Sequence, residues 1–327
     1  MTRIPSDLAV ISVTWNTREL VLNALRTLYA DLASSGLEAA VWIVDNQSSD
    51  GTPDAIRQQF PQTNVIEATA NLGFAAGNNV ALRALGFTDQ PGTAPNAPRA
   101  VFLLNPDTLT QAGAIRALYD ALFQLPHAGM VGARLYYEDG SFQHSAFRFP
   151  GLSQLALDLF PLPARLYGRL YETRLNGRYP RRLYEGDVPF RIDHPLGATM
   201  MLRKEVIEQV GLFDEQFFMY CEEVDWCLRI RKVSWEIYTV PTSKIYHLEG
   251  RSAIQIKPRS LLNLWTSRLK LYQKHYPAWK RQAAYVLIRT GMRLKIRAFE
   301  RDASLDGALR AALIDACQQV IDLTHRA

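Results

Sequence analysis

The amino-acid sequence predicts an α/β protein with a mostly parallel sheet. Three short apolar runs, at residues 8–13, 41–44 and 101–104, contain no charged residue and are typical of strands buried on both faces. Between the first two runs, apolar residues recur at helical spacing from Leu20 to Leu32. Because strands that alternate with helices are usually joined by right-handed crossovers, this order favours parallel strands.

Length and composition are consistent with this prediction. With 327 residues and 48% hydrophobic content, the chain can bury a substantial core as one large domain, or as one domain with an appendage. The chain has 37 basic and 32 acidic residues, and this mild excess suits anionic lipid, sugar phosphate or nucleic acid equally.

The cysteines and the N-terminus indicate the compartment. Cys221, Cys227 and Cys317 form no Cys-x-x-Cys pair, which favours a reducing environment. The first seven residues lack the apolar core of a signal peptide, and no stretch approaches the ~18 uncharged apolar residues of a membrane span. We therefore expect a cytoplasmic protein that spans no membrane.

Carboxylates follow two of the predicted strands. Asp45 ends the run at 41–44, and Asn105-Pro106-Asp107 follows the run at 101–104. Ligands of open α/β sheets bind at the carboxyl ends of the strands, so Asp107 is placed to hold a divalent cation against a nucleotide diphosphate. The alternative is a turn in which Asp107 or Thr108 caps a helix that begins near Gln111.

Further strands and helices complete the pattern. Asn16 and Glu19 predict a capping box for the first helix, and Pro241 separates two late strands. The other expected elements are strands at 64–67, 130–133 and 194–202, a hairpin at 136–147, and helices at 73–85, 111–125, 204–210 and 222–231. No Gly-x-Gly-x-x-Gly follows the first strand and no phosphate-binding Gly-x-x-x-x-Gly-Lys-Ser/Thr loop occurs, which argues against a dinucleotide fold and a P-loop.

Residues 150–190 differ in composition from the rest of the chain. This stretch is rich in Pro, Leu, Tyr and Arg, and we expect an irregular, partly helical, basic insertion. Its arginines either form a solvated face or contact a phosphorylated or lipid-linked acceptor. With the neighbouring Arg148 they are Arg165, Arg169, Arg174, Arg178, Arg181 and Arg182.

Two further sites carry chemistry or a structural role. Glu222 and Glu223 begin a helix, where the macrodipole favours acids, but a partly buried carboxylate there is also a candidate general base. Helical spacing places Glu222 with Asp225 and turns Glu223 elsewhere. His247, at the end of the last strand, is either structural or a metal ligand.

These stretches together resemble the family 2 inverting glycosyltransferases with a GT-A fold, in the branch that includes bacterial rhamnosyltransferases and other surface-polysaccharide enzymes. The resemblance covers about residues 8–275 and implies a Rossmann-like, mostly parallel sheet flanked by helices. It implies a glycosyltransferase domain at 1–258 and a C-terminal helical extension at 259–327. The blocks that carry it are 11–16, 43–52, 71–78, 103–107 and 197–229, followed by His247.

The resemblance also implies roles for individual residues. The nucleotide would be bound by Thr14, Asn16, Asp45, Asn71, Gly77, Asn78 and Asn105. Asp107 is the last position of the Asp-x-Asp motif and would bind Mg²⁺ or Mn²⁺, with His247 as a further ligand. Asn105 replaces the first acid of the motif, which suggests weaker metal retention. Glu223 would be the base; because this position is more often Asp, Glu222 stays a second candidate.

The function implied is inverting transfer of rhamnose or a similar sugar. We expect a dTDP- or UDP-linked donor, a lipid-linked or oligosaccharide acceptor in cell-surface polysaccharide biosynthesis, and no nucleic-acid partner. One alternative is a non-catalytic nucleotide- or carbohydrate-binding protein. Another is a sugar nucleotidyltransferase, which would usually show a Gly-rich basic loop where this chain has Thr14-Trp15-Asn16-Thr17.

The C-terminal residues suggest two amphipathic helices. Apolar residues recur from Leu261 to Tyr272, and Tyr285–Ile288 are followed by Arg289, Arg293, Lys295 and Arg297. Such helices could pack on the domain, form a homodimer, or rest on an anionic bilayer. The last alternative would place the protein peripherally on the cytoplasmic face of the inner membrane.

Overall fold

The computed structural model describes residues 6–160, 162–248 and 258–326. These residues form two compact units. The sheet unit contains residues 6–148, 179–216 and 223–248, and the helical unit contains residues 149–178, 217–222 and 258–326, apart from residue 161. The sequence-based division at residue 258 stays a prediction.

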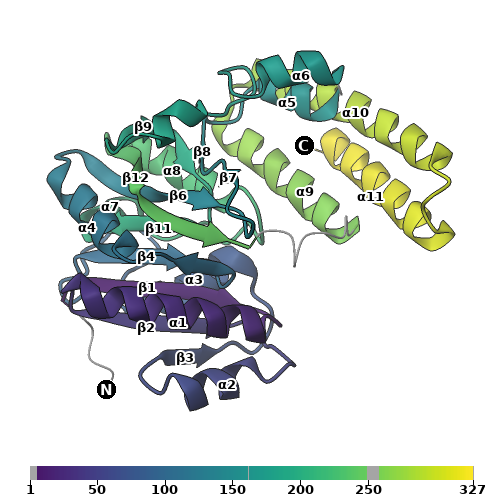
Figure 1. Ribbon diagram of the computed structural model, residues 1–327. Helices are drawn as coiled ribbons and strands as arrows, with labels where there is room; N and C mark the ends of the chain where they lie inside the picture. Colours follow the sequence, from purple (N-terminus) through teal and green to yellow (C-terminus); the bar gives the residue numbers. More distant parts are fainter. Residues whose placement is uncertain (1–5, 161, 249–257, 327) are drawn as a thin grey trace. The chain divides into compact units, whose positions relative to one another are not determined.

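The sheet unit contains a mixed, mostly parallel sheet in the order β3-β2-β1-β4-β11-β6-β12-β5 (Figure 1). Strands β1, β2, β3 and β4 are mutually parallel, as are β6 and β12, whereas β11 runs antiparallel to β4 and β6. The strands are β1 (Leu8–Thr14), β2 (Ala39–Asp45), β3 (Asn64–Glu67), β4 (Ala100–Leu104), β5 (Thr108–Thr110), β6 (Ala128–Tyr136), β11 (Thr199–Arg203) and β12 (Glu236–His247). The predicted α/β class and parallel core are confirmed.

Helices cover both faces of this sheet (Figure 1). Alternate residues of β1 point to opposite faces. Leu8 and Val10 join the core cluster under α1 and α4, whereas Val13 faces α3. The helices are α1 (Arg18–Ser35), α2 (Thr52–Gln59), α3 (Gly73–Ala84), α4 (Ala114–Gln124), α7 (Lys204–Val210) and α8 (Glu222–Lys232).

Shorter elements complete the sheet unit. Strand β7 (Phe142–Gln143) pairs with β6, and β9 (Phe190–Ile192) pairs with β12. Strands β8 (Ala146–Phe147) and β10 (His194–Pro195) form a separate two-stranded sheet, and a 3₁₀ helix, η1, spans Arg181–Tyr184. The hairpin expected at residues 136–147 therefore forms only in part, because β7 pairs with β6 whereas β8 pairs with β10.

Two local predictions are wrong. Asn16 does not cap α1, since its side chain accepts a hydrogen bond from the Ser49 amide and the first turn of α1 is held by Asp50, whose Oδ2 accepts from the Arg18 amide. Pro241 does not end a strand, because β12 continues through it. The pairing of β12 with β6 shifts register between Val240 and Lys244, and a bulge of this kind tolerates proline.

The helix-cap alternative for Asp107 and Thr108 is also wrong. Thr108 begins the short strand β5 instead, and α4 starts only at Ala114. The carboxylate of Asp31 in α1 accepts hydrogen bonds from the amides of Gly113 and Ile115 and so caps α4. Asp107 is therefore not needed for helix formation.

The helical unit contains α5 (Leu152–Leu159), α6 (Ala164–Leu170), α9 (Pro258–His275), α10 (Ala278–Arg301) and α11 (Gly307–Arg326). Helix α10 packs on α5 and α11, and α11 packs on α9. Two of these helices lie in the insertion, as expected. The other three lie in the C-terminal region that was predicted to be helical, where the sequence suggested two amphipathic helices and the structure has a third, α11. Among the described residues, no helix has the length and apolar character that crossing a membrane requires.

Candidate active site

The strands β1, β2 and β4 bring polar residues to one edge of the sheet. Thr14 and Asp45 are neighbours in the register of β1 and β2, and the Asn46 amide donates to the Thr14 carbonyl at 2.8 Å. Strand β4 runs parallel to β1, so Asn105 and Asp107 follow at the same edge. This is the edge at which ligands of open α/β sheets bind.

Asp45 is a buried carboxylate with spare bonding capacity. Its Oδ2 accepts a hydrogen bond from the Ser48 amide at 2.8 Å. Its Oδ1 has no hydrogen-bond partner among the described residues, although the residue is only 1% exposed. Burying a carboxylate oxygen without a partner is costly, so an oxygen of this kind indicates a ligand that donates to it.

The turns after β1 and β2 are tied together. Asn16, with a positive φ of 51°, donates its amide to Ser48 Oγ, and its Oδ1 accepts from the Ser49 amide, each at 2.8 Å. Sequence reasoning missed Ser48 and Asp50 as parts of the site; the run of small polar residues between β2 and α2 was the available signal.

The other predicted nucleotide ligands lie beside this edge. Asn71 Oδ1 accepts from the Gly73 amide at 3.0 Å and lies 3.5 Å from Asn46 Nδ2. A Cβ atom on Gly77 would lie 2.8 Å from Val13 Cγ1, so this glycine permits close packing of α3 on β1. Asn78 donates to the Phe74 carbonyl within its own helix. For Asn71, Gly77 and Asn78, as for Thr14, Asn16, Asp45 and Asn105, nucleotide binding stays a prediction.

Asp107 and His247 meet where β5 pairs with β12. His247 is opposite Thr108 in the register, and the Leu248 amide donates to the Asp107 carbonyl at 2.8 Å. This pairing brings His247 Nε2 to 3.4 Å from Asp107 Oδ1. Neither Asp107 Oδ1 nor His247 Nδ1 has a hydrogen-bond partner in the part of the chain that the structure describes.

The Asp107 carboxylate suits a hard divalent cation, and the His247 imidazole beside it is a second potential metal ligand of a softer kind. Mg²⁺ commonly takes one or two protein carboxylates and completes its coordination with substrate phosphate oxygens and water. Within residues 6–160, 162–248 and 258–326 there is no group of three or more His, Cys, Asp and Glu that could hold a metal. Asp107 and His247 offer two donors, one carboxylate oxygen and one imidazole nitrogen, 3.4 Å apart.

Glu223 lies close to the same strand ends. A Cβ atom on Gly197 would be 3.8 Å from Glu223 Cγ, and the neighbouring Ala198 carbonyl accepts from the Asn105 amide at 3.0 Å. The pKa of the Cys227 thiol lies well above its usual value. Burial is the largest cause, and the negative charge of Glu223 is the second. Glu223 is partly exposed, whereas Glu222 is only 5% exposed.

Asp225 and Arg229 have a structural role. Their side chains form an ion pair at 2.9 Å in which Asp225 is completely buried. The Arg229 guanidinium also donates to the carbonyls of Val210 at 2.6 Å and Leu212 at 2.8 Å. These bonds fix α8 to the loop that precedes it, and with it the position of Glu223.

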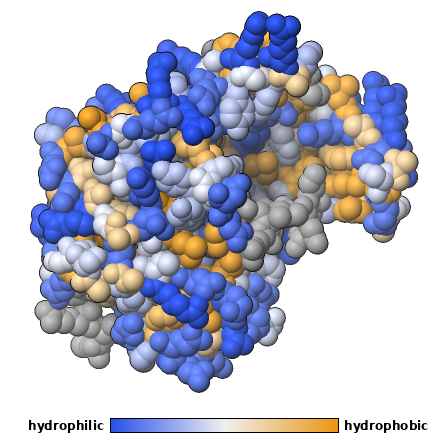
Figure 2. All heavy atoms as spheres, viewed as in Figure 1, coloured by the Kyte–Doolittle hydropathy of each residue, from blue (hydrophilic) through white to orange (hydrophobic). Residues whose placement is uncertain are grey.

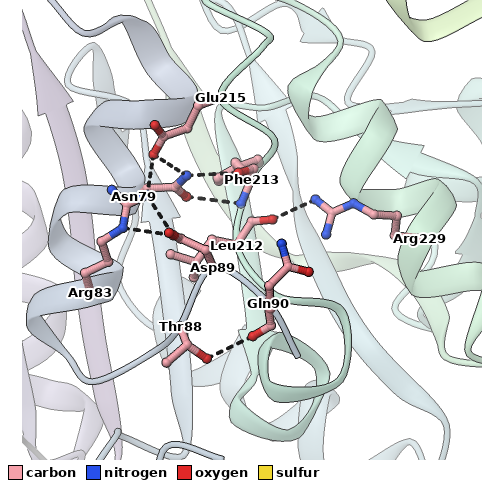
Figure 3. Close-up of polar contacts among 9 residues, drawn as sticks. All are labelled: Asn79, Arg83, Thr88, Asp89, Gln90, Leu212, Phe213, Glu215 and Arg229. Carbon is pink, nitrogen blue, oxygen red and sulfur yellow. Dashed lines mark hydrogen bonds and ion pairs between the residues drawn. The ribbon is translucent and has the colours of Figure 1, made fainter. Parts of the chain in front are cut away.

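A buried polar brace joins this loop to α3 (Figure 3). Asn79 Nδ2 donates to the Phe213 carbonyl and to Glu215 Oε1, both at 2.9 Å, and its Oδ1 accepts from the Phe213 amide at 3.1 Å. Arg83 extends the brace to Asp89 and Glu215, each at 2.6 Å. The brace connects α3 with the loop before α8.

We expect Asn79→Leu to lower the free energy of unfolding of the sheet unit by about 3 kcal/mol, because the amide and carbonyl of Phe213 would be left buried without partners. Urea titration followed by tryptophan fluorescence would measure the loss. Arg83→Met is the matched control, since its exposed ion pairs contribute at most about 1 kcal/mol. Equal losses in the two variants would contradict the assignment.

The known proteins to which this chain is similar are glycosyltransferases. Residues 5–265 match the family described as "Glycosyltransferase like family 2". An N-acetylglucosaminyl-diphospho-decaprenol L-rhamnosyltransferase of Mycobacterium tuberculosis is 32% identical over 216 residues, which is 65% of this chain and 67% of that protein. A low-salt glycan biosynthesis hexosyltransferase, Agl10, of Haloferax volcanii is 27% identical over 69% of this chain and 62% of that protein.

Solved structures share the fold. GalNAc-T7, solved with UDP, GalNAc and Mn²⁺, matches 98% of this chain and 56% of its own, with a TM-score of 0.56 and 12% identity. The mannosyltransferase PcManGT of Pyrobaculum calidifontis, solved with GDP-Man and Mn²⁺, matches 99% of this chain and 88% of its own, with a TM-score of 0.53 and 16% identity. At these identities the likeness concerns the fold alone.

Proposed function

Because the chain belongs to the glycosyltransferase-like family 2, we propose that it transfers rhamnose or a similar sugar, with inversion, from a dTDP- or UDP-linked donor to a lipid-linked glycan. Membership in this family makes the chain a nucleotide-sugar-dependent glycosyltransferase of the rhamnosyltransferase-like type. The sugar, the nucleotide and the acceptor are the parts that we propose.

The convergence of side chains at one sheet edge carries the proposal. Thr14 and Asp45 are adjacent on parallel strands, and Asp107, directly before β5, has its Oδ1 3.4 Å from Nε2 of His247, the last residue of β12. Glu223 is joined to this edge through Gly197 and the hydrogen bond between Ala198 and Asn105. This arrangement supports the proposal, because it would let a nucleotide, a cation and a base act together at the carboxyl ends of the strands.

We propose that Asp107 and His247 hold Mg²⁺ or Mn²⁺. The bound cation would supply charge stabilisation for the departing diphosphate without proton transfer. Both solved structures contain Mn²⁺, and Asp107 Oδ1, which has no hydrogen-bond partner among the described residues, is a suitable oxygen donor here. Asn105 contributes no charge, so the carboxylate of Asp107 is the negative ligand that this motif offers.

Glu223 would act as the general base. In an in-line displacement the acceptor hydroxyl oxygen bonds to the anomeric carbon while the bond from that carbon to the diphosphate oxygen breaks. The diphosphate leaves with the bonding electrons, and the hydroxyl proton passes to the Glu223 carboxylate. Glu222 is too buried to reach a substrate as readily, so Glu223 is the preferred candidate.

The lipid-linked acceptor is proposed by analogy. The Mycobacterium tuberculosis relative is named for a sugar on diphospho-decaprenol and for L-rhamnose. An acceptor of the same chemical class, with a diphosphate between a sugar and a polyprenyl chain, would fit a cytoplasmic enzyme at the membrane surface.

Hydrolysis of a panel of nucleotide sugars would test the donor. We expect the full chain with Mn²⁺ to release free sugar slowly from dTDP-rhamnose or a UDP-sugar, and chelation by EDTA to abolish the release, because the cation supports departure of the diphosphate. Product chromatography would measure it. Nucleotide binding without hydrolysis or transfer on any donor would favour a non-catalytic binding protein instead.

A further inference from the structure

Helix α10 uses one side for packing within the helical unit. Ala284, Tyr285, Ile288, Gly291 and Met292 are buried, and the helix packs on α5 and α11. A Cβ atom on Gly291 would lie only 2.6 Å from Leu159 Cδ2, so this side is closely packed. The apolar residues that made this stretch amphipathic in the sequence are thus already covered in part.

The opposite side of α10 is exposed and has its own apolar residues. Trp279 is 70% exposed, Val286 53% and Leu294 42%. At about 100° per residue, these side chains project from the same side of the helix as three exposed arginines. We call the set the outward strip; it comprises Trp279, Val286, Arg293, Leu294, Arg297 and Arg301.

Charge is distributed unequally between the two units. The described residues of the helical unit include 17 Lys and Arg against 8 Asp and Glu, whereas those of the sheet unit include 17 against 23. Helix α10 contains a single acid, Glu300. In the described part of the chain, none of the three arginines of the outward strip forms an ion pair with an acid.

We propose that the outward strip of α10 docks the protein on an anionic lipid bilayer. An interfacial helix presents apolar side chains, often Trp, together with Lys and Arg, and lies in the plane of the membrane. Each basic residue near an anionic surface adds to the attraction. Figure 2 shows that the surface over α10 and α11 mixes hydrophobic with strongly hydrophilic residues, as such a contact requires.

The arginine-rich insertion contributes residues of the same kind. Leu166 is 44% exposed beside Arg165 and Arg169, and Leu175 is 53% exposed beside Arg174. These residues belong to the helical unit, in which α5 packs on α10. The insertion therefore has exposed apolar residues beside arginines, like the outward strip, although α5 itself packs on the buried side of α10 through Leu159 and Gly291.

The inference deepens the proposed function, because a lipid-linked acceptor is presented at a membrane. Its test does not depend on that function: vesicle binding requires no sugar transfer. Donor hydrolysis, measured on the same samples, reports on the sheet unit alone, so failure of either proposal is visible separately.

Vesicle co-sedimentation of the full chain tests the docking surface. We expect binding to vesicles of phosphatidylcholine mixed with phosphatidylglycerol, little binding to phosphatidylcholine alone, and loss of binding at high salt. The triple variant Arg293→Gln/Arg297→Gln/Arg301→Gln should partition about a hundredfold less onto the anionic vesicles. Trp279→Ala should weaken binding about tenfold through lost apolar burial.

The matched control is Arg26→Gln/Arg57→Gln/Arg116→Gln, which removes the same charge from exposed arginines of the sheet unit. The control should bind vesicles as the unaltered chain does, and the α10 variants should keep the thermal unfolding midpoint. The control itself can lose a little stability, because Arg57 and Arg116 form exposed ion pairs. Unaltered vesicle binding by the α10 triple variant would overturn the proposal, as would no binding by the unaltered chain. A dimer, seen by light scattering and lost in the triple variant, without vesicle binding, would assign the strip to a second copy instead.

Discussion

Asp107→Asn is expected to abolish cation-dependent nucleotide binding and to lower turnover by about a thousandfold. The substitution keeps the shape of the side chain but removes the negative charge that the proposed cation needs, and a bound cation contributes several kcal/mol to stabilising the departing diphosphate. Calorimetric titration with UDP and dTDP, with and without Mn²⁺, would measure the binding, and product chromatography would measure turnover.

The fold should survive this substitution. Asp107 Oδ1 has no hydrogen-bond partner among the described residues, and the pairing of β5 with β12 uses backbone atoms. The thermal midpoint of Asp107→Asn should therefore match that of Asp139→Asn, an acid in the exposed turn between β6 and β7 that serves as the control. An Asp107→Asn protein that retained Mn²⁺-assisted binding of UDP would show that the cation is held elsewhere.

The strands at the ligand edge could be predicted from the sequence because the signal is local. The apolar runs of β1, β2 and β4 end at Thr14, Asp45 and Leu104, and a polar residue at a strand's end stands out in a single chain. The rule that ligands bind at the carboxyl ends of parallel strands then groups residues that are distant in the sequence. Asp107 and His247 were grouped through the family resemblance, and the register of β5 and β12 now brings them together.

Contacts that join distant segments could not be predicted in this way. Asp50, in the loop after β2, caps α1, and Asp31, in α1, caps α4. The sequence pattern offered only residues close to each helix, Asn16 for α1 and Asp107 or Thr108 for α4. The brace of Asn79 to Phe213 spans 134 positions of the chain. Burial of the polar group decides such contacts, and only the packed structure reveals which backbone groups need a partner.

The charge of the helical unit illustrates the same limit. The net charge of +5 for the whole chain is small, because the excess of acidic residues in the sheet unit offsets the excess of basic residues in the helical unit. Helical spacing suggested a basic amphipathic helix at 285–297, but it could not say that Tyr285 and Ile288 pack inside the unit while Trp279 and Val286 stay exposed.

Glu223→Gln is expected to lower kcat by roughly a hundredfold to ten-thousandfold, the usual contribution of a general base, while donor affinity stays unchanged. Glutamine keeps the length of the side chain but accepts no proton at neutral pH. In the unaltered enzyme, kcat/KM should fall at low pH as the base becomes protonated. In the variant, this decrease of kcat/KM at low pH should be absent. Initial rates across pH, together with calorimetry for the donor, would separate chemistry from binding.

Glu222→Gln is the matched control for this prediction, because it makes the same change one residue earlier in α8. Glu222 is 5% exposed and lies in the first turn, so its loss should cost helix stability of about 0.3–1 kcal/mol rather than turnover. Glu223→Asp should recover part of the rate, since the carboxylate returns one methylene shorter. If Glu222→Gln stopped turnover while Glu223→Gln did not, the proton would be taken by Glu222, and the contact of Glu223 with Gly197 would serve packing alone.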